Sequence, residues 1–258
     1  MAQTVLITGA SSGIGKGYAY EFGKRGYNLI LVARNQNKLT EIQSDLIGSY
    51  SISVHLFIMD LSEIDAASSL LNQVKTKDLS VDILINNAGF STKGLFDSSD
   101  FGVQRREMIL NMVTLTELAY LFTKEWSGKS DKAIINVASA SAFQSTPYNA
   151  VYGSTKAYVL SLTEALHVEY QDKGIYHLAV CPGPTDTAFF DDIGDFDFSR
   201  KRTVEDVVAT TFKAMAKKKV IAMDGWFTKL RAQAPRILSR KRMTQIGGAI
   251  AGKYWNEG

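Results

Sequence analysis

The chain has 258 residues, a mass of 28.4 kDa, 45% hydrophobic residues and a formal net charge of +3. That length is enough for one large, well-buried domain, and we expect a single domain over residues 1–258. The only cysteine, Cys181, excludes an internal disulfide, and no apolar run approaches the roughly 20 residues that a membrane span needs. Because residues 1–8 already resemble a strand, we expect no signal peptide and a cytoplasmic protein.

Short apolar runs alternate along the chain with longer segments of helical periodicity. The runs consist mostly of Val, Ile and Leu without polar alternation, which is typical of strands buried on both faces of a sheet. The predicted strands are Thr4–Thr8, Asn28–Ala33, Ser53–Met59, Val81–Asn86, Ala133–Val137, Tyr176–Cys181 and Lys219–Met223. Helices are predicted between them at residues 13–25, 36–47, 62–75, 103–125, 151–171 and 203–217. This β-α-β order predicts an α/β fold, a doubly wound parallel sheet with helices on both faces.

A glycine-rich turn joins the first predicted strand to the first helix. It contains Gly9, Gly13 and Gly15 in the sequence Thr-Gly-Ala-Ser-Ser-Gly-Ile-Gly. Glycine at such a joint permits a tight turn and lets the backbone approach a pyrophosphate, which the helix N-terminus attracts. The spacing differs from the common dinucleotide fingerprint, and also from a P-loop, because Lys16 is not followed by Ser or Thr. Its position favours a dinucleotide site over a purely structural turn.

Polar residues follow the second, third and fourth predicted strands. Arg34, with Lys38 four residues later, stands where dinucleotide folds place an acid for a ribose 2′-hydroxyl or an arginine for a 2′-phosphate. The pair therefore favours NADPH over NADH, and a solvated loop arginine is the alternative. Asp60 is a candidate to accept from the adenine amino group, or else to cap the helix expected from Ser62. Asn86-Asn-Ala-Gly89 closes the fourth strand at the carboxyl edge, where open α/β sheets bind ligands.

Three later residues have the chemistry to move a proton to or from a carbonyl oxygen. Tyr152 and Lys156 lie four apart on a predicted helix, hence on one face. The chain has other Tyr-x-x-x-Lys pairs, but only this one has a serine, Ser139, at the end of a buried strand shortly before it. A lysine ammonium favours the phenolate of a tyrosine whose ordinary pKa is about 10. We expect Ser139 to hold the substrate oxygen while Tyr152 exchanges the proton and hydride moves to or from the cofactor.

In their order, these motifs resemble those of the short-chain dehydrogenase/reductase family over nearly the whole chain. The resemblance also rests on Asn111 and on Pro182-Gly-Pro-Thr-Asp-Thr187. It implies a Rossmann-type fold with about seven parallel strands, and Arg34 matches the NADP-preferring branch.

The resemblance implies a role for each catalytic residue. Tyr152 is the acid or base, and Ser139 orients the carbonyl. Lys156 lowers the pKa of the tyrosine and grips the nicotinamide ribose. Asn111 holds a water in a proton relay with Lys156; the alternative for Asn111 is a helix-interior amide that satisfies a local backbone kink.

The resemblance further implies that the segment after Cys181 covers the nicotinamide, with Thr187 near its carboxamide. The expected cofactor-binding residues are Gly9, Ser11, Ser12, Gly13, Ile14, Gly15, Arg34, Lys38, Asp60, Leu61, Asn87, Ala88, Gly89, Tyr152, Lys156, Pro182, Gly183, Thr185 and Thr187. No metal site is expected, because the three histidines show no ligand spacing.

Two segments in the last third of the chain have more than one interpretation. Residues 188–202 are the expected substrate lid, whose phenylalanines fit either an apolar substrate or anchoring of the lid to the body. Residues 225–258 form a basic extension that departs from the usual end of the family. It is expected to lie on an anionic membrane, to pack over the substrate pocket or to contact a partner subunit. Packing is favoured, because Pro235 and Gly247-Gly248 are expected to interrupt a long amphipathic helix.

These observations favour an NADPH-dependent oxidoreductase that interconverts a carbonyl, either a ketone or an aldehyde, and the matching alcohol, with an apolar small-molecule substrate. One alternative is a β-ketoacyl-thioester reductase, in which Lys129, Lys132 and Lys173 would meet an acidic carrier protein. Others are a non-catalytic NADPH sensor and a membrane-surface protein. The resemblance implies a homodimer or homotetramer, and no nucleic-acid motif accompanies the basic end.

Overall fold

The computed structural model describes residues 2–187, 189 and 201–255. Within these residues, seven strands form one parallel sheet in the order β3-β2-β1-β4-β5-β6-β7. The strands are β1 (Thr4–Thr8), β2 (Asn28–Ala33), β3 (Val54–Ile58), β4 (Ile83–Asn86), β5 (Lys132–Val137), β6 (Ile175–Cys181) and β7 (Ile221–Met223). All seven predicted strands are present, some shorter by one or two residues at an end. The predicted Rossmann-type α/β fold is therefore confirmed.

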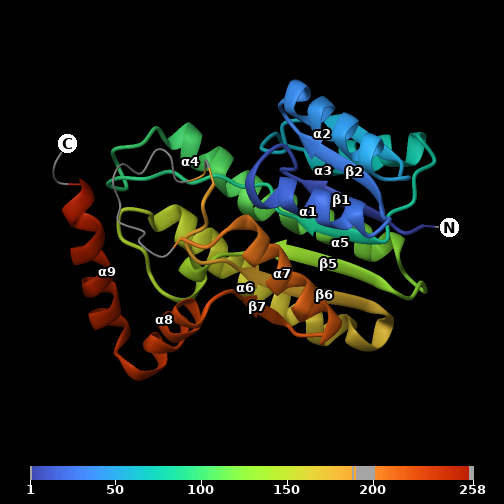
Figure 1. Ribbon diagram of the computed structural model, residues 1–258. Helices are drawn as coiled ribbons and strands as arrows, with labels where there is room; N and C mark the ends of the chain where they lie inside the picture. The colour runs from blue at the N-terminus through green and yellow to red at the C-terminus, as the bar shows by residue number, and fades with distance from the viewer. Residues whose placement is uncertain (1, 188, 190–200, 256–258) are drawn as a thin grey trace.

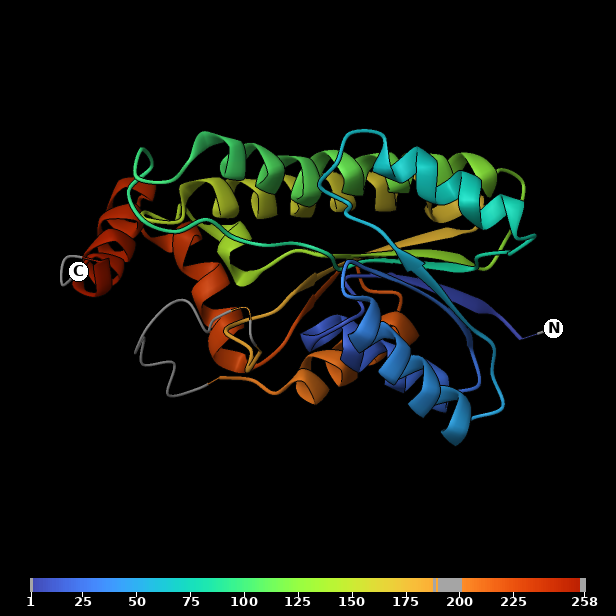
Figure 2. The same ribbon diagram turned by 90° about the horizontal axis from the view of Figure 1, so that it is seen from above.

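The strands are apolar because the sheet is covered on both faces. Every residue of β1 and β6 is buried, and β1 pairs with β2 from Thr4 opposite Asn28 to Thr8 opposite Val32. Helices α1 (Gly13–Lys24), α2 (Gln36–Ser49) and α7 (Val204–Ala216) cover one face. The other face carries α3 (Ala66–Thr76), α4 (Phe101–Met108), α5 (Leu115–Glu125) and α6 (Ala150–Tyr170), as Figure 2 shows.

Two of the predicted helices differ from the structure. The third begins at Ala66, not at residue 62, because Asp60 to Asp65 form turns after β3. The single helix expected at 103–125 is divided: α4 and α5 are joined by a π-helical turn, η1 (Ile109–Thr114). Such a turn is common at functional sites, and here it contains Asn111.

The basic end of the chain forms two helices, α8 (Trp226–Ile237) and α9 (Arg240–Trp255), at one end of the molecule (Figure 1). The expectation that Pro235 and Gly247-Gly248 interrupt helices is wrong, because α8 includes Pro235 and α9 runs through both glycines. The break lies at Leu238 and Ser239, where the Ser239 hydroxyl accepts from the Arg242 amide at 3.4 Å.

Both helices pack on the chain itself. A Cβ added to Gly248 would lie 3.4 Å from the ring of Pro147, and one added to Gly252 would lie 3.1 Å from the Tyr148 hydroxyl. This close packing offsets the roughly 1 kcal/mol that glycine costs inside a helix. Helix α8 also contacts the short 3₁₀ helix η2 (Ala140–Phe143), which follows Ser139. In the described part of the chain, α8 and α9 thus pack on the segments at residues 140–148. None of the described helices combines the length and the apolar character needed to span a bilayer.

Candidate active site

The predicted motifs meet at the carboxyl edge of the sheet, on the side where α8 and α9 lie (Figure 1). Successive strands are added on one side of β1 as far as β3, and on its other side from β4 onwards. The strand order therefore reverses between β1 and β4, which are neighbours although far apart in sequence. Open α/β sheets bind ligands in the crevice at such a switch point. A cleft of about 320 Å³ opens there, within the 300–1,000 Å³ range of small-molecule sites.

The glycine turn after β1 needs its glycines. Gly9 and Gly13 have φ of +65° and +51°, in the left-handed region that favours glycine. A Cβ on Gly9 would lie 2.9 Å from the Ala88 Cα, and one on Gly15 would lie 2.3 Å from the Gly9 carbonyl oxygen. The turn therefore packs directly against the loop after β4, and α1 begins with its N-terminus at the cleft.

The loops after β1 and β4 are joined by polar contacts. The Thr8 hydroxyl accepts from the amides of Asn87 at 2.9 Å and Ala88 at 3.0 Å. The Asn87 side-chain amide donates to the Thr8 carbonyl at 3.0 Å and to the Gly9 carbonyl at 3.2 Å. These contacts fix the glycine turn relative to Asn86-Asn-Ala-Gly89, so both motifs line one cleft.

At the far end of the cleft, Arg34 and Asp60 lie together. The Arg34 guanidinium is 3.6 Å from Asp60 Oδ2, and 73% of the Arg34 side chain is exposed. Asp60 Oδ1 accepts from the amide and hydroxyl of Ser62 at 2.9 and 2.7 Å. Partial burial acts to raise the pKa of Asp60, but these hydrogen bonds and the charge of Arg34 outweigh it and hold the pKa below its ordinary value. Asp60 thus closes the turn after β3, while the helix that it was expected to cap begins later, at Ala66.

Ser139, Tyr152 and Lys156 converge at the other end. The Lys156 ammonium lies 5.6 Å from the centre of the Tyr152 ring and donates to the Val137 carbonyl at 2.8 Å. The Ser139 hydroxyl accepts from the Ser141 amide at 3.1 Å and also hydrogen-bonds Tyr152. The spacing of Tyr152 and Lys156 therefore places both side chains beside Ser139.

Burial dominates the electrostatics of this group. It raises the pKa of Tyr152 to about 12, although the hydrogen bond with Ser139 acts in the opposite direction. It also lowers the pKa of Lys156 to about 8. The lowered tyrosine pKa expected from the lysine is not found in this structure, because desolvation of the buried phenol dominates and the charge of Glu107 acts in the same direction.

Asn111 is completely buried and binds a neighbouring segment, not its own helix. Its side-chain nitrogen donates to the Phe90 carbonyl at 2.9 Å and to the Thr155 hydroxyl at 3.2 Å, and its oxygen accepts from the Phe90 amide at 3.3 Å. A Cβ on Gly89 would lie 2.9 Å from the Asn111 oxygen and 3.6 Å from Lys156 Nζ. The amide therefore lies next to the lysine, across Gly89.

The model of the short chain dehydrogenase family matches residues 3–217, which include all of these motifs. The chain belongs to the short-chain dehydrogenase family. A structure of a short-chain dehydrogenase from Sphingobium yanoikuyae in complex with NADPH is 31% identical, with a TM-score of 0.80, covering 97% of this chain and 94% of that one. The bulky-bulky ketone specific alcohol dehydrogenase from Comamonas testosteroni is 29% identical, with a TM-score of 0.77, covering 97% and 92%.

Among curated relatives, the very-long-chain 3-oxoacyl-CoA reductase of Rattus norvegicus is 29% identical over 188 residues, covering 70% of this chain and 59% of the rat protein. The hydroxysteroid dehydrogenase-like protein 1 of Gallus gallus is 31% identical over 183 residues, covering 69% and 54%. This short-chain dehydrogenase thus matches between half and three-fifths of the length of these relatives.

Most of the predicted cofactor residues line the cleft of this short-chain dehydrogenase. Those that do are Gly9, Ser11, Ser12, Gly13, Ile14, Arg34, Asp60, Leu61, Asn87, Ala88, Gly89, Tyr152, Lys156, Pro182, Gly183, Thr185 and Thr187. Gly15 and Lys38 do not. Gly15 instead allows α1 to approach Gly9, and Lys38 is an exposed residue of α2 whose amide donates to the Asn35 side chain.

The close backbone approach at Gly9 and Gly13 leaves room for a pyrophosphate at the start of α1, and Arg34 supplies a cation at the adenosine end. These residues fit a nicotinamide dinucleotide. Among the described residues, no cluster of His, Cys, Asp or Glu side chains is suited to hold a metal ion.

Sequence reasoning missed several residues of the site. These are Val32, Ala33, Asn35, Met59, Phe90, Leu110, Val137 and Ala138, which also line the cleft. Phe189, a residue of the expected lid, lines it too. Phe189 contacts Tyr152, with ring centres 5.6 Å apart, and the Lys93 ammonium donates to the Phe189 carbonyl at 3.5 Å. The remaining residues of the expected lid, apart from Lys201 and Arg202, lie outside the described part of the chain.

Glu107 was also missed. It is completely buried, and one carboxylate oxygen accepts from the amide of Thr92 at 2.8 Å and from the Thr92 hydroxyl. Burial raises the pKa of Glu107 despite these hydrogen bonds. Glu107 and Asn111 are four residues apart, and they hold Thr92 and Phe90 of one segment. The signal in the sequence was an acid one helical turn before Asn111 in the same predicted helix.

Proposed function

We propose that this short-chain dehydrogenase is an NADPH-dependent oxidoreductase that interconverts a ketone or aldehyde and the corresponding alcohol. The observation that carries the proposal is the convergence of Ser139, Tyr152 and Lys156 at one end of a cleft that has Arg34 at its other end. NADPH supplies hydride when bound. The remaining chemistry is proton transfer, for which the chain provides its own groups.

Tyr152 is the proposed proton donor for reduction. With a pKa of about 12 it keeps its proton at neutral pH and so has one to give to the carbonyl oxygen. The Ser139 hydroxyl, within hydrogen-bonding reach of Tyr152, holds that oxygen in place. The Lys156 ammonium stabilises the phenolate that remains after transfer, and Asn111 beside it supports return of the proton.

Arg34 is the proposed determinant of cofactor choice. Its guanidinium is largely exposed at the adenosine end, and its only described ion pair is the 3.6 Å contact with Asp60. A ribose 2′-phosphate there would form charge-assisted hydrogen bonds with Arg34, worth about 1.5–3 kcal/mol.

Titration with NADPH and NADH, followed by nucleotide fluorescence, tests the proposal. Arg34→Ala is expected to weaken NADPH about 10- to 100-fold and NADH less than about three-fold. Lys38→Ala is the matched control, because Lys38 is a nearby cation outside the cleft, and we expect a small and equal effect on both nucleotides. Equal weakening of both by Arg34→Ala would contradict the role of Arg34. Tight NADPH binding without turnover of any carbonyl would leave a non-catalytic sensor as the interpretation.

An apolar substrate is proposed because Phe90, Leu110 and Phe189 line the cleft. A 3-oxoacyl thioester is the second candidate, since relatives of about 29% identity are named very-long-chain 3-oxoacyl-CoA reductases. The positions of the lysines expected to meet a carrier protein do not favour a thioester carried by such a protein. Lys132 begins β5, so that it and the nearby Lys129 and Lys173 lie at the amino-terminal edge of the sheet, opposite Ser139. Lys132 is also paired with Asp82. Comparing kcat/KM for a 3-oxoacyl-CoA and for a bulky apolar ketone at the same NADPH concentration separates these two substrate classes.

We also propose two kinds of partner. One is a second subunit, paired through α5 and α6 in the expected homodimer or homotetramer. Exposed apolar side chains on η1, α5 and α6 support this pairing: Val113, Tyr120, Tyr158 and Val168. Light scattering of the purified protein tests for a dimer or tetramer.

Helix α8 supports peripheral contact with an anionic membrane, within a cytoplasmic location. Trp226 and Leu230, whose exposed fractions are 69% and 59%, lie on one face of α8 with Lys229. Lys229 also lines a pocket together with Lys213, Lys217 and Lys219. None of these lysines has an ion pair in the described residues. Such a face suits acidic headgroups. We expect sedimentation with phosphatidylserine vesicles but not phosphatidylcholine vesicles, and loss of it in Trp226→Ser/Leu230→Ser.

A further inference from the structure

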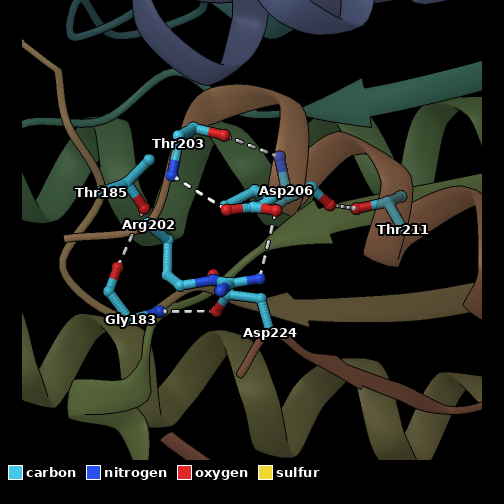
Figure 3. A network of polar contacts seen from close by, with 8 residues as sticks. Gly183, Thr185, Arg202, Thr203, Asp206, Thr211 and Asp224 are labelled. Atoms are coloured by element: carbon cyan, nitrogen blue, oxygen red, sulfur yellow. Dashed lines mark hydrogen bonds and ion pairs between the residues drawn. The ribbon is translucent and has the colours of Figure 1, made fainter. Parts of the chain in front are cut away.

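A buried carboxylate lies just beyond the strand β7 and contacts two segments that are distant in sequence. Only 1% of the Asp224 side chain is exposed. Its Oδ1 accepts from the Gly183 amide at 2.9 Å, and its Oδ2 faces the Arg202 Nε at 3.4 Å, as Figure 3 shows. One carboxylate therefore links Gly183, which lines the cofactor cleft, to the last residue of the expected lid.

Arg202 is held by further contacts at the same place. Its amide donates to the Pro184 carbonyl and its carbonyl accepts from the Asp186 amide, both at 2.8 Å, so that it forms a parallel bridge with Thr185. Its guanidinium also lies 3.3 Å from an Asp206 oxygen in the first turn of α7 (Figure 3). The two ends of the segment from Gly183 to Arg202 thus meet and are fixed to β7 and α7.

These two ends, which together form the base of the segment, have little freedom to move. A Cβ on Gly183 would lie 2.6 Å from the hydroxyl of the buried Thr228 in α8, so the Gly183 backbone fits between Asp224 and α8. Phe189 lies within the segment, and its ring contacts Tyr152. The place of Phe189 over the reacting tyrosine therefore depends on where the base of the segment is fixed.

We propose that Asp224 and Arg202 are positioning residues, which fix Gly183–Thr187 at the base of the expected lid so that Phe189 is held against Tyr152 at the carbonyl site. This inference rests on the proposed function. An ion pair with one partner almost fully buried is sensitive to loss of either charge, since the remaining one is left without compensation. The nearby pair of Lys201 and Asp186 is exposed, at 3.7 Å, and contributes little to the base.

Three variants separate the two contacts of Asp224. Asp224→Asn keeps an oxygen for the Gly183 amide but removes the charge that faces Arg202. Arg202→Met leaves Asp224 buried without its cation, and the double variant removes both charges. Lys201→Ala is the matched control, because it removes an ion pair of the same segment that is exposed.

Two readouts are used. With a bulky apolar ketone and saturating NADPH, we expect Asp224→Asn to raise KM about ten-fold while kcat and the Kd for NADPH change less than about three-fold. The double variant should be no worse than Arg202→Met, because the two residues act as one unit. Lys201→Ala should match the wild type. Unchanged KM in a folded Asp224→Asn protein, or additive effects of the two substitutions, would overturn the proposal.

The second readout needs no catalysis. Chymotrypsin cleavage after Phe189 should be about ten-fold faster in Asp224→Asn than in wild type or Lys201→Ala. Equal cleavage rates would overturn the proposal even if the enzyme is active. Faster cleavage in a protein that reduces no carbonyl would uphold the positioning of the segment and count against the proposed function alone.

Discussion

The Lys156 ammonium donates to the Val137 carbonyl at 2.8 Å, two residues before Ser139. The end of β5 therefore fixes both the lysine and the serine, although the lysine comes from α6. Tyr152, one turn earlier on α6, is brought to the same strand end. Any change in the packing of α6 on β5 would alter all three groups together.

Tyr152→Phe removes the proposed proton donor and keeps the ring that packs against Phe189. We expect kcat to fall about 10²- to 10⁴-fold, while NADPH binding measured by fluorescence changes little. Tyr120→Phe is the control, because Tyr120 also has a lysine four residues later but is 64% exposed on α5. Retained turnover in Tyr152→Phe would show that another group donates the proton.

The pKa of about 8 for Lys156 predicts the pH dependence of reduction. Below that pH the ammonium is charged and stabilises the Tyr152 phenolate, and above it the charge is lost. We expect kcat/KM for carbonyl reduction to fall as pH rises through about 8, measured in buffers of constant ionic strength. A flat profile between pH 7 and 9.5 would contradict this.

The charge of Lys156 that assists catalysis is expected to destabilise the folded protein. Its pKa is about 8 when folded and 10.5 ordinarily, so between these values the unfolded chain binds more protons and stability rises with pH. Burial of the charge therefore costs about 3 kcal/mol below pH 8. Allowing about 1 kcal/mol for the lost hydrogen bond, Lys156→Met should be about 2 kcal/mol more stable than wild type at pH 7. Urea unfolding should show this gain shrinking towards pH 10.5.

Two glycines allow a matched test of the turn. Gly15→Ala would place a methyl group 2.3 Å from the Gly9 carbonyl, so we expect NADPH binding at least ten-fold weaker and lower stability. Gly48→Ala, in α2, meets no atom within 4 Å and should instead stabilise the protein by about 1 kcal/mol with unchanged NADPH binding. Fluorescence titration and thermal unfolding measure both effects. Normal binding by Gly15→Ala would show that the turn tolerates a displaced helix.

Glu107 predicts a stability difference that depends on pH. Burial raises its pKa above the ordinary 4.5, so the folded state binds the extra proton and stability falls as pH rises from that value. Glu107→Gln removes this dependence and keeps an oxygen for the Thr92 amide. Its stability relative to wild type should therefore increase between pH 4 and 7 in urea titrations. The exposed Glu41→Gln should show no such trend. If the difference in unfolding free energy between Glu107→Gln and wild type does not change with pH, the raised pKa of Glu107 is contradicted.

The sequence alone determined the sheet and the main parts of the cleft. Apolar runs without alternation identify strands buried on both faces, and Gly9, Asn87 and Ser139 each follow such a run. Parallel strands have their carboxyl ends at one edge, so residues that follow strands must meet there. That reasoning needs only local pattern and topology. The pairing of Tyr152 with Ser139 rested instead on the spacing of Tyr152 and Lys156 and on the serine at the strand end shortly before them.

The contacts decided by tertiary packing were not visible in this way. The π-helical turn that presents Asn111, the hold of Glu107 on Thr92 and the pairing of Asp224 with Arg202 each depend on two segments meeting in one register. The two C-terminal helices formed despite Gly247 and Gly248 because Pro147 and Tyr148 pack against that side of α9. Helix propensity and charge are local, whereas burial and its effect on the pKa of Tyr152 arise only when distant segments exclude water together.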